Sequence, residues 1–205
     1  MPARAPVPSL DVGDARLIIA TAKDHGVLRN ALAYMLATAW HETAFTMKPV
    51  REAFWLSEAW RKKNLRYWPH YGRGYVMLTW PFNYQKAEDE TGAPISRDLD
   101  LAMDPKLAAI ILVVGMTEGW FTKKRLDRYV TLSKSDFRNA RRVVNGMDRA
   151  DAIAGYARQF DALLLAEGYG VDAPSAPVPS PEPEGERGAL AAFLAALWAV
   201  FAPKR

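Results

Sequence analysis

Three glutamates that could serve as acid–base catalysts lie close together in the sequence: Glu42, Glu52 and Glu58. Glu42 ends an apolar, helix-like segment, where the helix dipole and partial burial favour a neutral, proton-carrying carboxyl group. Glu52 follows Lys48 and Arg51 in an expected loop, where basic neighbours favour its ionised form. Two carboxyl groups in unlike environments can protonate a leaving oxygen and activate water, which is the chemistry of glycoside hydrolysis. Glu58 remains an alternative to Glu52 as the second carboxylate.

Aromatic residues are concentrated around these carboxyl groups. Twelve of the 23 Trp, Tyr and Phe residues lie between Trp40 and Tyr84. Trp and Tyr are seldom fully buried, and their flat apolar faces with polar rims suit the C–H faces of sugar rings. This density predicts a cleft lined by aromatic side chains.

The sequence offers little material for metal, thiol or nucleotide chemistry. It has no cysteine and three histidines. The pair His41-Glu42 begins the zinc-protease motif H-E-x-x-H, but Phe45 occupies the place of the second histidine. The glycines on either side of Arg73 lack the remainder of a phosphate-binding loop. We therefore expect no metal, no cofactor and no nucleic-acid partner.

Composition and charge are those of a folded, mildly basic protein. Half of the 205 residues are hydrophobic and 24% are charged, which excludes a wholly disordered chain. The net charge is +4, and residues 172–205 contain four acidic and three basic residues, so the first 171 residues carry +5. A basic domain is attracted to polyanions such as cell-wall polymers.

Local patterns predict a mainly α fold with one small β-hairpin or sheet near residue 75. Apolar spacing and capping residues predict helices over 28–43, 82–91, 106–121 and 148–167, and one more helix that Ser135 caps and that ends at Gly146. Asp104, followed by proline, is a strong start signal for the third of these. The segment from Gly74 to Trp80 is the one that favours a strand.

The chain divides into four segments by composition. We expect a disordered N-terminus over 1–9, a helical domain over 10–171, a Pro-rich linker over 172–187 and an apolar tail over 188–205. The tail has 14 uncharged apolar residues, whereas a spanning helix needs about 20. We expect the tail to associate with a membrane, and the sequence leaves open whether it spans the bilayer or lies on it. A short helix docked on the domain is the alternative.

Three blocks of sequence resemble a known family. They are H-E-T at 41–43, Y-G-R-G-Y-V-M-L-T-W-P-F-N-Y at 71–84 and V-N-G at 144–146. They resemble glycoside hydrolase family 19, and within it the phage-type endolysin branch, over roughly residues 10–170. The resemblance implies a lysozyme-like, two-lobed helical fold. It also implies cleavage of β-1,4 links next to N-acetylated amino sugars in peptidoglycan or chitin.

The resemblance also implies roles for individual residues. By position, Glu42 matches the general acid, Glu52 the second carboxylate and Thr79 the residue that positions the water. The mechanism is then inverting, and such enzymes hold their two carboxyl groups about 6.5–9.5 Å apart. Asn83 and Asn145 match asparagines that bind the acetamido sugar. The complete set of expected substrate-binding residues is His41, Tyr71, Arg73, Tyr75, Trp80, Asn83 and Asn145.

The chain departs from the family pattern at three places. Ala44 followed directly by Phe45 replaces the two glycines that often precede the phenylalanine, so the loop after the acid differs. Met77 stands where the family has a glutamine, which removes one sugar-binding amide. A functional arginine of the family falls near Arg149 in a loose alignment.

The expected function is that of an endolysin-type glycosidase that hydrolyses peptidoglycan glycan strands and causes bacterial lysis. We expect a monomer without a signal peptide, which accumulates in the cytoplasm and reaches the wall through a membrane lesion. The alternatives are a chitinase of the same fold and a non-catalytic, membrane-tethered protein that binds the cell wall. The sequence leaves open which glycosidic bond is cut.

Overall fold

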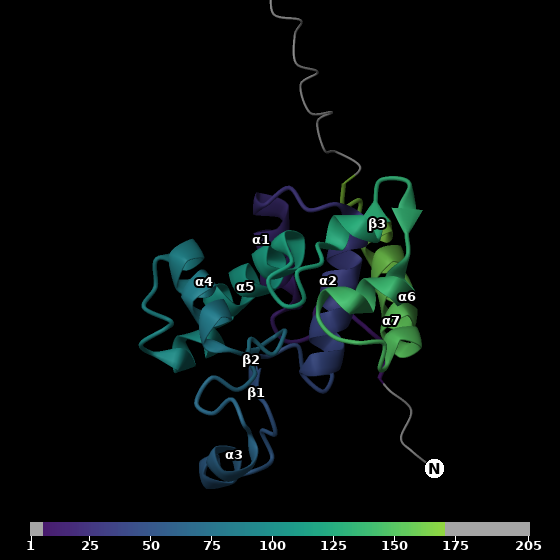
Figure 1. The fold of residues 1–205 in the computed structure, drawn as a ribbon. Helices are drawn as coiled ribbons and strands as arrows, with labels where there is room; N and C mark the ends of the chain where they lie inside the picture. Colours follow the sequence, from purple (N-terminus) through teal and green to yellow (C-terminus); the bar gives the residue numbers. More distant parts are fainter. Residues whose placement is uncertain (1–5, 171–205) are drawn as a thin grey trace, which may run out of the picture. The chain divides into compact units, whose positions relative to one another are not determined.

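The computed structural model describes residues 6–170, and these are mainly helical, as the sequence predicts (Figure 1). The α-helices are α1 (Ala15–Asp24), α2 (Arg29–Glu42), α3 (Glu58–Asn64), α4 (Pro81–Thr91), α5 (Pro105–Glu118), α6 (Phe137–Ala140) and α7 (Ala150–Ala166). Three short 3-10 helices cover Leu99–Met103, Leu126–Arg128 and Arg141–Val143. The expected linker and tail lie outside the described residues, as does most of the expected disordered N-terminus. Pro8, in the described part of that N-terminus, is already buried.

Helices α4 and α5 begin and end where local chemistry places them. The Asp104 carboxylate accepts hydrogen bonds from the backbone N–H groups of Lys106 and Leu107, and α5 stops at Gly119, which is left-handed. Helix α4 begins at Pro81 and likewise stops at a left-handed glycine, Gly92. These caps confirm the predicted starts of both helices.

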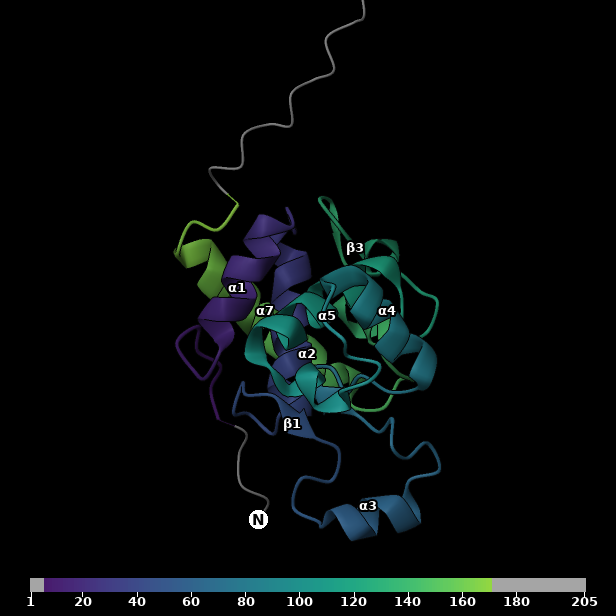
Figure 2. The ribbon, with the colours of Figure 1, turned by 90° about the vertical axis from the view of Figure 1, so that its left-hand side faces the viewer.

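Two helices form the centre of the molecule. Helix α2 is buried along most of its length and packs against α7, whereas α5 packs against α1 and α4 (Figures 1 and 2). Burial on nearly all sides explains why α2 has almost no polar face. Glu42, the last residue of α2, is therefore held by a rigid element.

The predicted strand near residue 75 is shorter than expected. Strand β2 (Arg73–Gly74) pairs antiparallel with β1 (Val50–Arg51), and Arg73 forms a further bridge with Leu78. The residues between Gly74 and Leu78 form a tight turn, in which Met77 has a φ of 56°. This small sheet connects the helical body to the segment that carries α3, which projects away from the other helices (Figures 1 and 2).

The predicted helix from Ser135 to Gly146 is wrong in its details. Ser135 belongs to strand β4 (Lys134–Ser135), which pairs with β3 (Val130–Thr131). The true cap is Asp136, whose carboxylate accepts from the backbone N–H of Asn139 at 3.2 Å. Helix α6 has one turn and passes directly into a 3-10 turn.

Within residues 6–170, no helix combines the length and the apolar character needed to span a bilayer.

Candidate active site

One open cleft of about 490 Å³ brings together the residues that the sequence singles out for catalysis. Glu42, Glu52 and Thr79 all line it, together with Asn83 and Asn145. Volumes of a few hundred Å³ are typical of ligand-binding pockets. These five residues come from α2, the end of β1, the turn before α4, α4 itself and the loop before α7. The fold therefore gathers residues separated by up to a hundred positions in the chain.

Glu42 is held by a buried arginine. The Arg141 guanidinium donates from Nη1 to Oε1 of Glu42 at 2.9 Å, and its Nε donates to the carbonyl of Asp148 at 3.2 Å. Only 4% of the Arg141 side chain and 18% of the Glu42 side chain are exposed. This arginine lies 99 residues from Glu42 in the sequence. Among the described residues, Oε2 of Glu42 has no hydrogen-bond partner, so this oxygen is available to a ligand.

The turn after Glu42 contains no glycine but adopts a conformation that favours it. Ala44 and Phe45 adopt φ values of 49° and 70°, the left-handed region that glycine tolerates best. The Thr43 hydroxyl donates to the Ala39 carbonyl at 2.7 Å and accepts from the Met47 N–H at 3.0 Å, which ties the turn to α2. The chain therefore bends through a glycine-type conformation without glycine.

Glu52 is held at both oxygens. The Tyr67 hydroxyl donates to Oε1 at 2.7 Å and the backbone N–H of Gly72 donates to Oε2 at 3.0 Å. Burial and the bond to Glu52 raise the pKa of Tyr67 to about 12, so its hydroxyl keeps its proton and remains a donor at neutral pH. Each Glu52 oxygen retains a lone pair that can accept a proton or a water hydrogen bond.

Glu58 does not line the cleft, and its oxygens are engaged elsewhere. Oε1 accepts from Trp68 Nε1 at 3.0 Å and Oε2 accepts from the Tyr71 hydroxyl at 2.9 Å. Burial works to raise the pKa of Glu58, but these two bonds and the nearby Arg61 charge outweigh it and lower that pKa. The structure thus brings Glu52, and not Glu58, to the same cleft as Glu42.

Thr79 and Asn83 form one unit at the start of α4. The Thr79 hydroxyl donates to the Met77 carbonyl at 2.7 Å, which leaves its oxygen free to accept a hydrogen bond from water. Asn83 donates from Nδ2 to the Thr79 carbonyl at 3.0 Å, and its buried Oδ1 has no partner within the described chain. Asn145 is exposed and uses its side-chain oxygen to accept from the Gly146 N–H at 2.8 Å.

Four of the expected substrate-binding residues do not line the cleft, and three of these four are buried. Tyr71 and Tyr75 are fully buried, and Arg73 is 5% exposed. Arg73 donates to Asp100, to the Tyr84 hydroxyl and to two backbone carbonyls, and its guanidinium carbon lies 3.8 Å from the centre of the Tyr71 ring. The Tyr75 hydroxyl donates to Asp14 at 2.7 Å. These side chains hold the sheet and the turn that carry the site, and none of the three lines the cleft.

His41 is half-buried beside the cleft and does not line it. Burial lowers the pKa of His41. The Arg141 and Arg149 charges lower it further, whereas the Glu42 and Asp148 carboxylates work to raise it. His41 is therefore neutral near pH 7 and gives no charge to a ligand. Arg149 does not line the cleft either.

The cleft has aromatic walls, as the sequence predicts. Trp80 lies against Tyr67 with ring centroids 5.2 Å apart, and the Arg66 guanidinium lies 5.5 Å from the centre of the Trp80 ring. The remaining aromatic lining residues are Phe54, Trp55 and Phe121. The sequence does not single out Arg66, Phe121 or Arg141, because no local pattern distinguishes them.

Within residues 6–170, no group of three or more metal-ligating side chains is placed to hold a metal ion.

Comparisons with protein-family models, with curated proteins and with solved structures found no match to this chain.

Proposed function

We propose that this protein is a glycosidase that hydrolyses β-1,4 links in the glycan strands of peptidoglycan, acting as an endolysin on a lysozyme-like, two-lobed fold. The observation that carries the proposal is the shared cleft, in which Glu42 and Glu52 are held by different partners. Two carboxyl groups in unlike settings are what glycoside hydrolysis requires. The resemblance of three sequence blocks to glycoside hydrolase family 19 supports the same assignment.

Glu42 is the general acid in this proposal. Its unpartnered Oε2 carries the proton and transfers it to the glycosidic oxygen as the bond from that oxygen to the anomeric carbon breaks. Arg141 donates to the other oxygen, Oε1, and so fixes the orientation of the carboxyl group. The helix α2 keeps the acid in place.

Glu52 is the general base. A water molecule between Glu52 and Thr79 attacks the anomeric carbon from the face opposite the leaving oxygen, and Glu52 accepts the water's proton. The configuration at that carbon is then inverted. The separation of about 6.5–9.5 Å between the two carboxyl groups, typical of inverting enzymes, stays a prediction.

Asn83, Asn145 and the aromatic walls bind the sugar in this proposal. The unpartnered Oδ1 of Asn83 can accept a hydrogen bond from an N–H group, such as that of an acetamido substituent. Trp80 offers an exposed ring to a sugar face. The domain's positive charge suits an anionic wall polymer.

The test compares the protein with its Glu42→Gln, Glu52→Gln and Glu58→Gln variants on purified peptidoglycan and on chitin oligomers. We expect new reducing ends on peptidoglycan, identified by mass spectrometry, and a loss of about 10²–10⁴-fold in the first two variants. Glu58→Gln is the matched control, because its carboxylate lies outside the cleft, and it retains activity. Peptide-bond cleavage, or full activity in Glu42→Gln, would refute the proposal. Products from chitin alone would assign the protein as a chitinase, and binding without products would indicate a non-catalytic wall-binding protein.

A further inference from the structure

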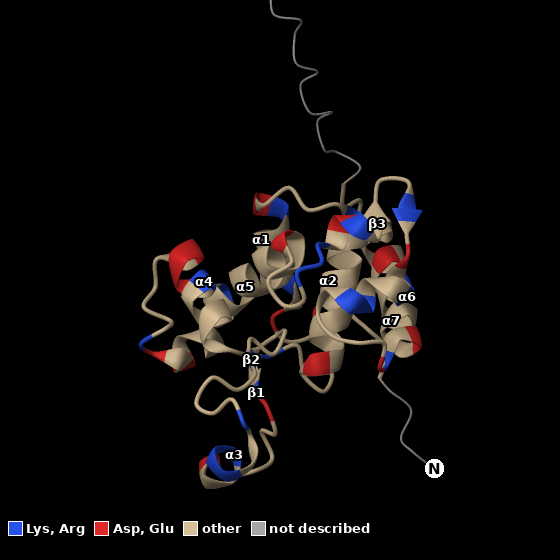
Figure 3. Cartoon of the chain, in the orientation of Figure 1, with Lys and Arg blue, Asp and Glu red and all other residues tan. Residues whose placement is uncertain are grey.

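Residues 53–68, which we call the arm, contain α3 and project away from the helical body (Figures 1 and 2). The arm has four basic residues, Arg61, Lys62, Lys63 and Arg66, and one acidic residue, Glu58. It therefore carries three of the five net positive charges of the first 171 residues. Figure 3 shows this concentration of positive charge on α3.

Helix α3 is anchored to the rest of the protein through Arg61 and Glu58. Arg61 is buried, and Nη1 of its guanidinium donates to the Leu56 carbonyl. Glu58 accepts from a buried tyrosine hydroxyl. Lys62 follows Glu58 by one helical turn, and Trp60 and Lys63 lie on the other side of the helix. Trp60, Lys62 and Lys63 are all exposed, and together with Trp68 we call them the outer face of the arm.

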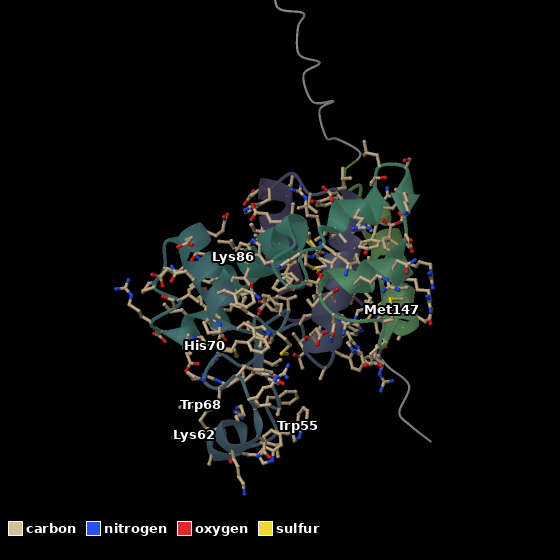
Figure 4. All side chains as sticks on the ribbon, in the orientation of Figure 1. Trp55, Lys62, Trp68, His70, Lys86 and Met147 are labelled. Atoms are coloured by element: carbon tan, nitrogen blue, oxygen red, sulfur yellow. The ribbon has the colours of Figure 1, made fainter. Side chains whose placement is uncertain are left out.

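Exposed tryptophans accompany these lysines. Trp60 is 39% exposed and Trp68 is 38% exposed, and Nζ of Lys62 lies 5.0 Å from the centre of the Trp68 ring. Neither tryptophan lines the cleft, in contrast to Trp55. Figure 4 shows Lys62 and Trp68 together at one side of the arm and Trp55 at the other. The outer face is therefore a surface distinct from the candidate active site.

We propose that this outer face docks on a phospholipid bilayer with anionic headgroups. Tryptophan side chains are enriched at the membrane–water interface, where the ring contacts both acyl chains and water. Lysine side chains at the same level can extend to the anionic phosphates of the headgroups. A glycan-binding face would need free directional polar groups beside its rings. Here the Asn64 amide donates to the Trp60 carbonyl and the Trp68 Nε1 donates to Glu58, so these groups serve the arm itself.

The test measures the partition of the full chain onto vesicles of equal parts phosphatidylglycerol and phosphatidylcholine, and onto vesicles of phosphatidylcholine alone. We expect partition onto the anionic vesicles that weakens with salt. The double variant Lys62→Gln/Lys63→Gln is expected to lower the partition coefficient about tenfold or more, because each lysine near an anionic surface contributes substantially to binding. Trp60→Ser is a second variant that removes the ring without changing charge, and it is expected to reduce partition severalfold.

The matched control is Lys23→Gln/Arg158→Gln, which removes two exposed positive charges from helices α1 and α7. All variants keep residues 171–205, so a difference between the two double variants reports on the arm alone. Equal partition of the two double variants would overturn the proposal. So would a loss of binding to purified peptidoglycan with binding to anionic vesicles intact. The proposal does not rest on the proposed catalysis, because Lys62 and Lys63 lie outside the cleft and release of reducing ends from soluble glycan fragments should be unchanged.

Discussion

Arg141 and Glu42 lie 99 residues apart in the sequence and form a 2.9 Å ion pair at the edge of the cleft. In the proposed mechanism the pair holds one oxygen of the acid and turns the other toward the substrate. We expect Arg141→Lys to lower kcat/KM about tenfold to a hundredfold, because it keeps the charge but loses the planar geometry that fixes the carboxylate. Arg141→Gln also removes the charge of this ion pair, so we expect kcat/KM to fall further than in Arg141→Lys.

The two Arg141 variants are compared by their activity and by their stability. Steady-state kinetics on soluble glycan fragments across the pH range, with thermal unfolding measured alongside, separates a loss of fold from a change in catalysis. An Arg141→Gln variant that folds normally and keeps its full kcat/KM would contradict the positioning of Glu42 by Arg141.

The Tyr67–Glu52 hydrogen bond makes a second prediction. Tyr67→Phe removes the donor to Oε1 of Glu52 and leaves the ring in the cleft wall. Because a hydrogen bond to a charged group contributes about 1.5–3 kcal/mol, we expect kcat/KM to fall about tenfold or more. Tyr169→Phe is the matched control, since its hydroxyl bonds the Val27 carbonyl away from the cleft. Equal activity of the two variants would show that Tyr67 does not position Glu52.

Arg73 is expected to matter for stability more than for substrate binding. Arg73→Met leaves the Pro69 carbonyl without its donor and removes one of the two donors to the Tyr71 carbonyl, so we expect the free energy of unfolding to fall by about 3 kcal/mol. Urea titration measures this loss, and Arg97→Met, at an exposed site, should change it little. A higher KM with unchanged stability would instead restore Arg73 to the substrate-binding role that the sequence suggests.

Two histidines should make the fold less stable in mild acid. Burial lowers the pKa of His41, and burial together with the Arg73 charge lowers the pKa of His70. Below the ordinary histidine pKa of about 6.5, the unfolded chain therefore binds more protons than the folded one. The free energy of unfolding then declines as the pH falls from that value toward the lower pKa of the folded state. Unfolding measured between about pH 7 and pH 5 should show this slope, and His41→Gln/His70→Gln should flatten it. An unchanged slope in the double variant would contradict this origin of the pH dependence.

The sequence predicts what local interactions determine. The starts of α4 and α5 follow from Pro81, Asp104 and Pro105, since a cap and its helix are neighbours in the chain. Ser135 was the wrong cap because Asp136 offers a carboxylate one residue later, and strand pairing with β3 occupies Ser135.

In the candidate site too, the sequence identifies some functional residues and misses others. Glu42, Glu52, Thr79, Asn83 and Asn145 were identified by residue type and by resemblance, and the fold brings them to one cleft. The partners of the two carboxylates come from distant segments, so no pattern near Glu42 or Glu52 could reveal them. The same limit explains Tyr71, Arg73 and Tyr75, whose polar ends suggest a ligand but bond carboxylates of the protein, namely Glu58, Asp100 and Asp14.

The two carboxylates belong to parts of the molecule with very different local stability. Glu42 ends a helix buried in the core, whereas Glu52 follows a two-residue strand that pairs with only two residues of β2. Opening of that short ladder exposes little apolar surface, so it costs less free energy than unfolding of α2 and α7. In increasing denaturant Glu52, the proposed base, should therefore lose its position while Glu42, the proposed acid, keeps its own. The proposed hydrolytic activity should then disappear before the helical signal does.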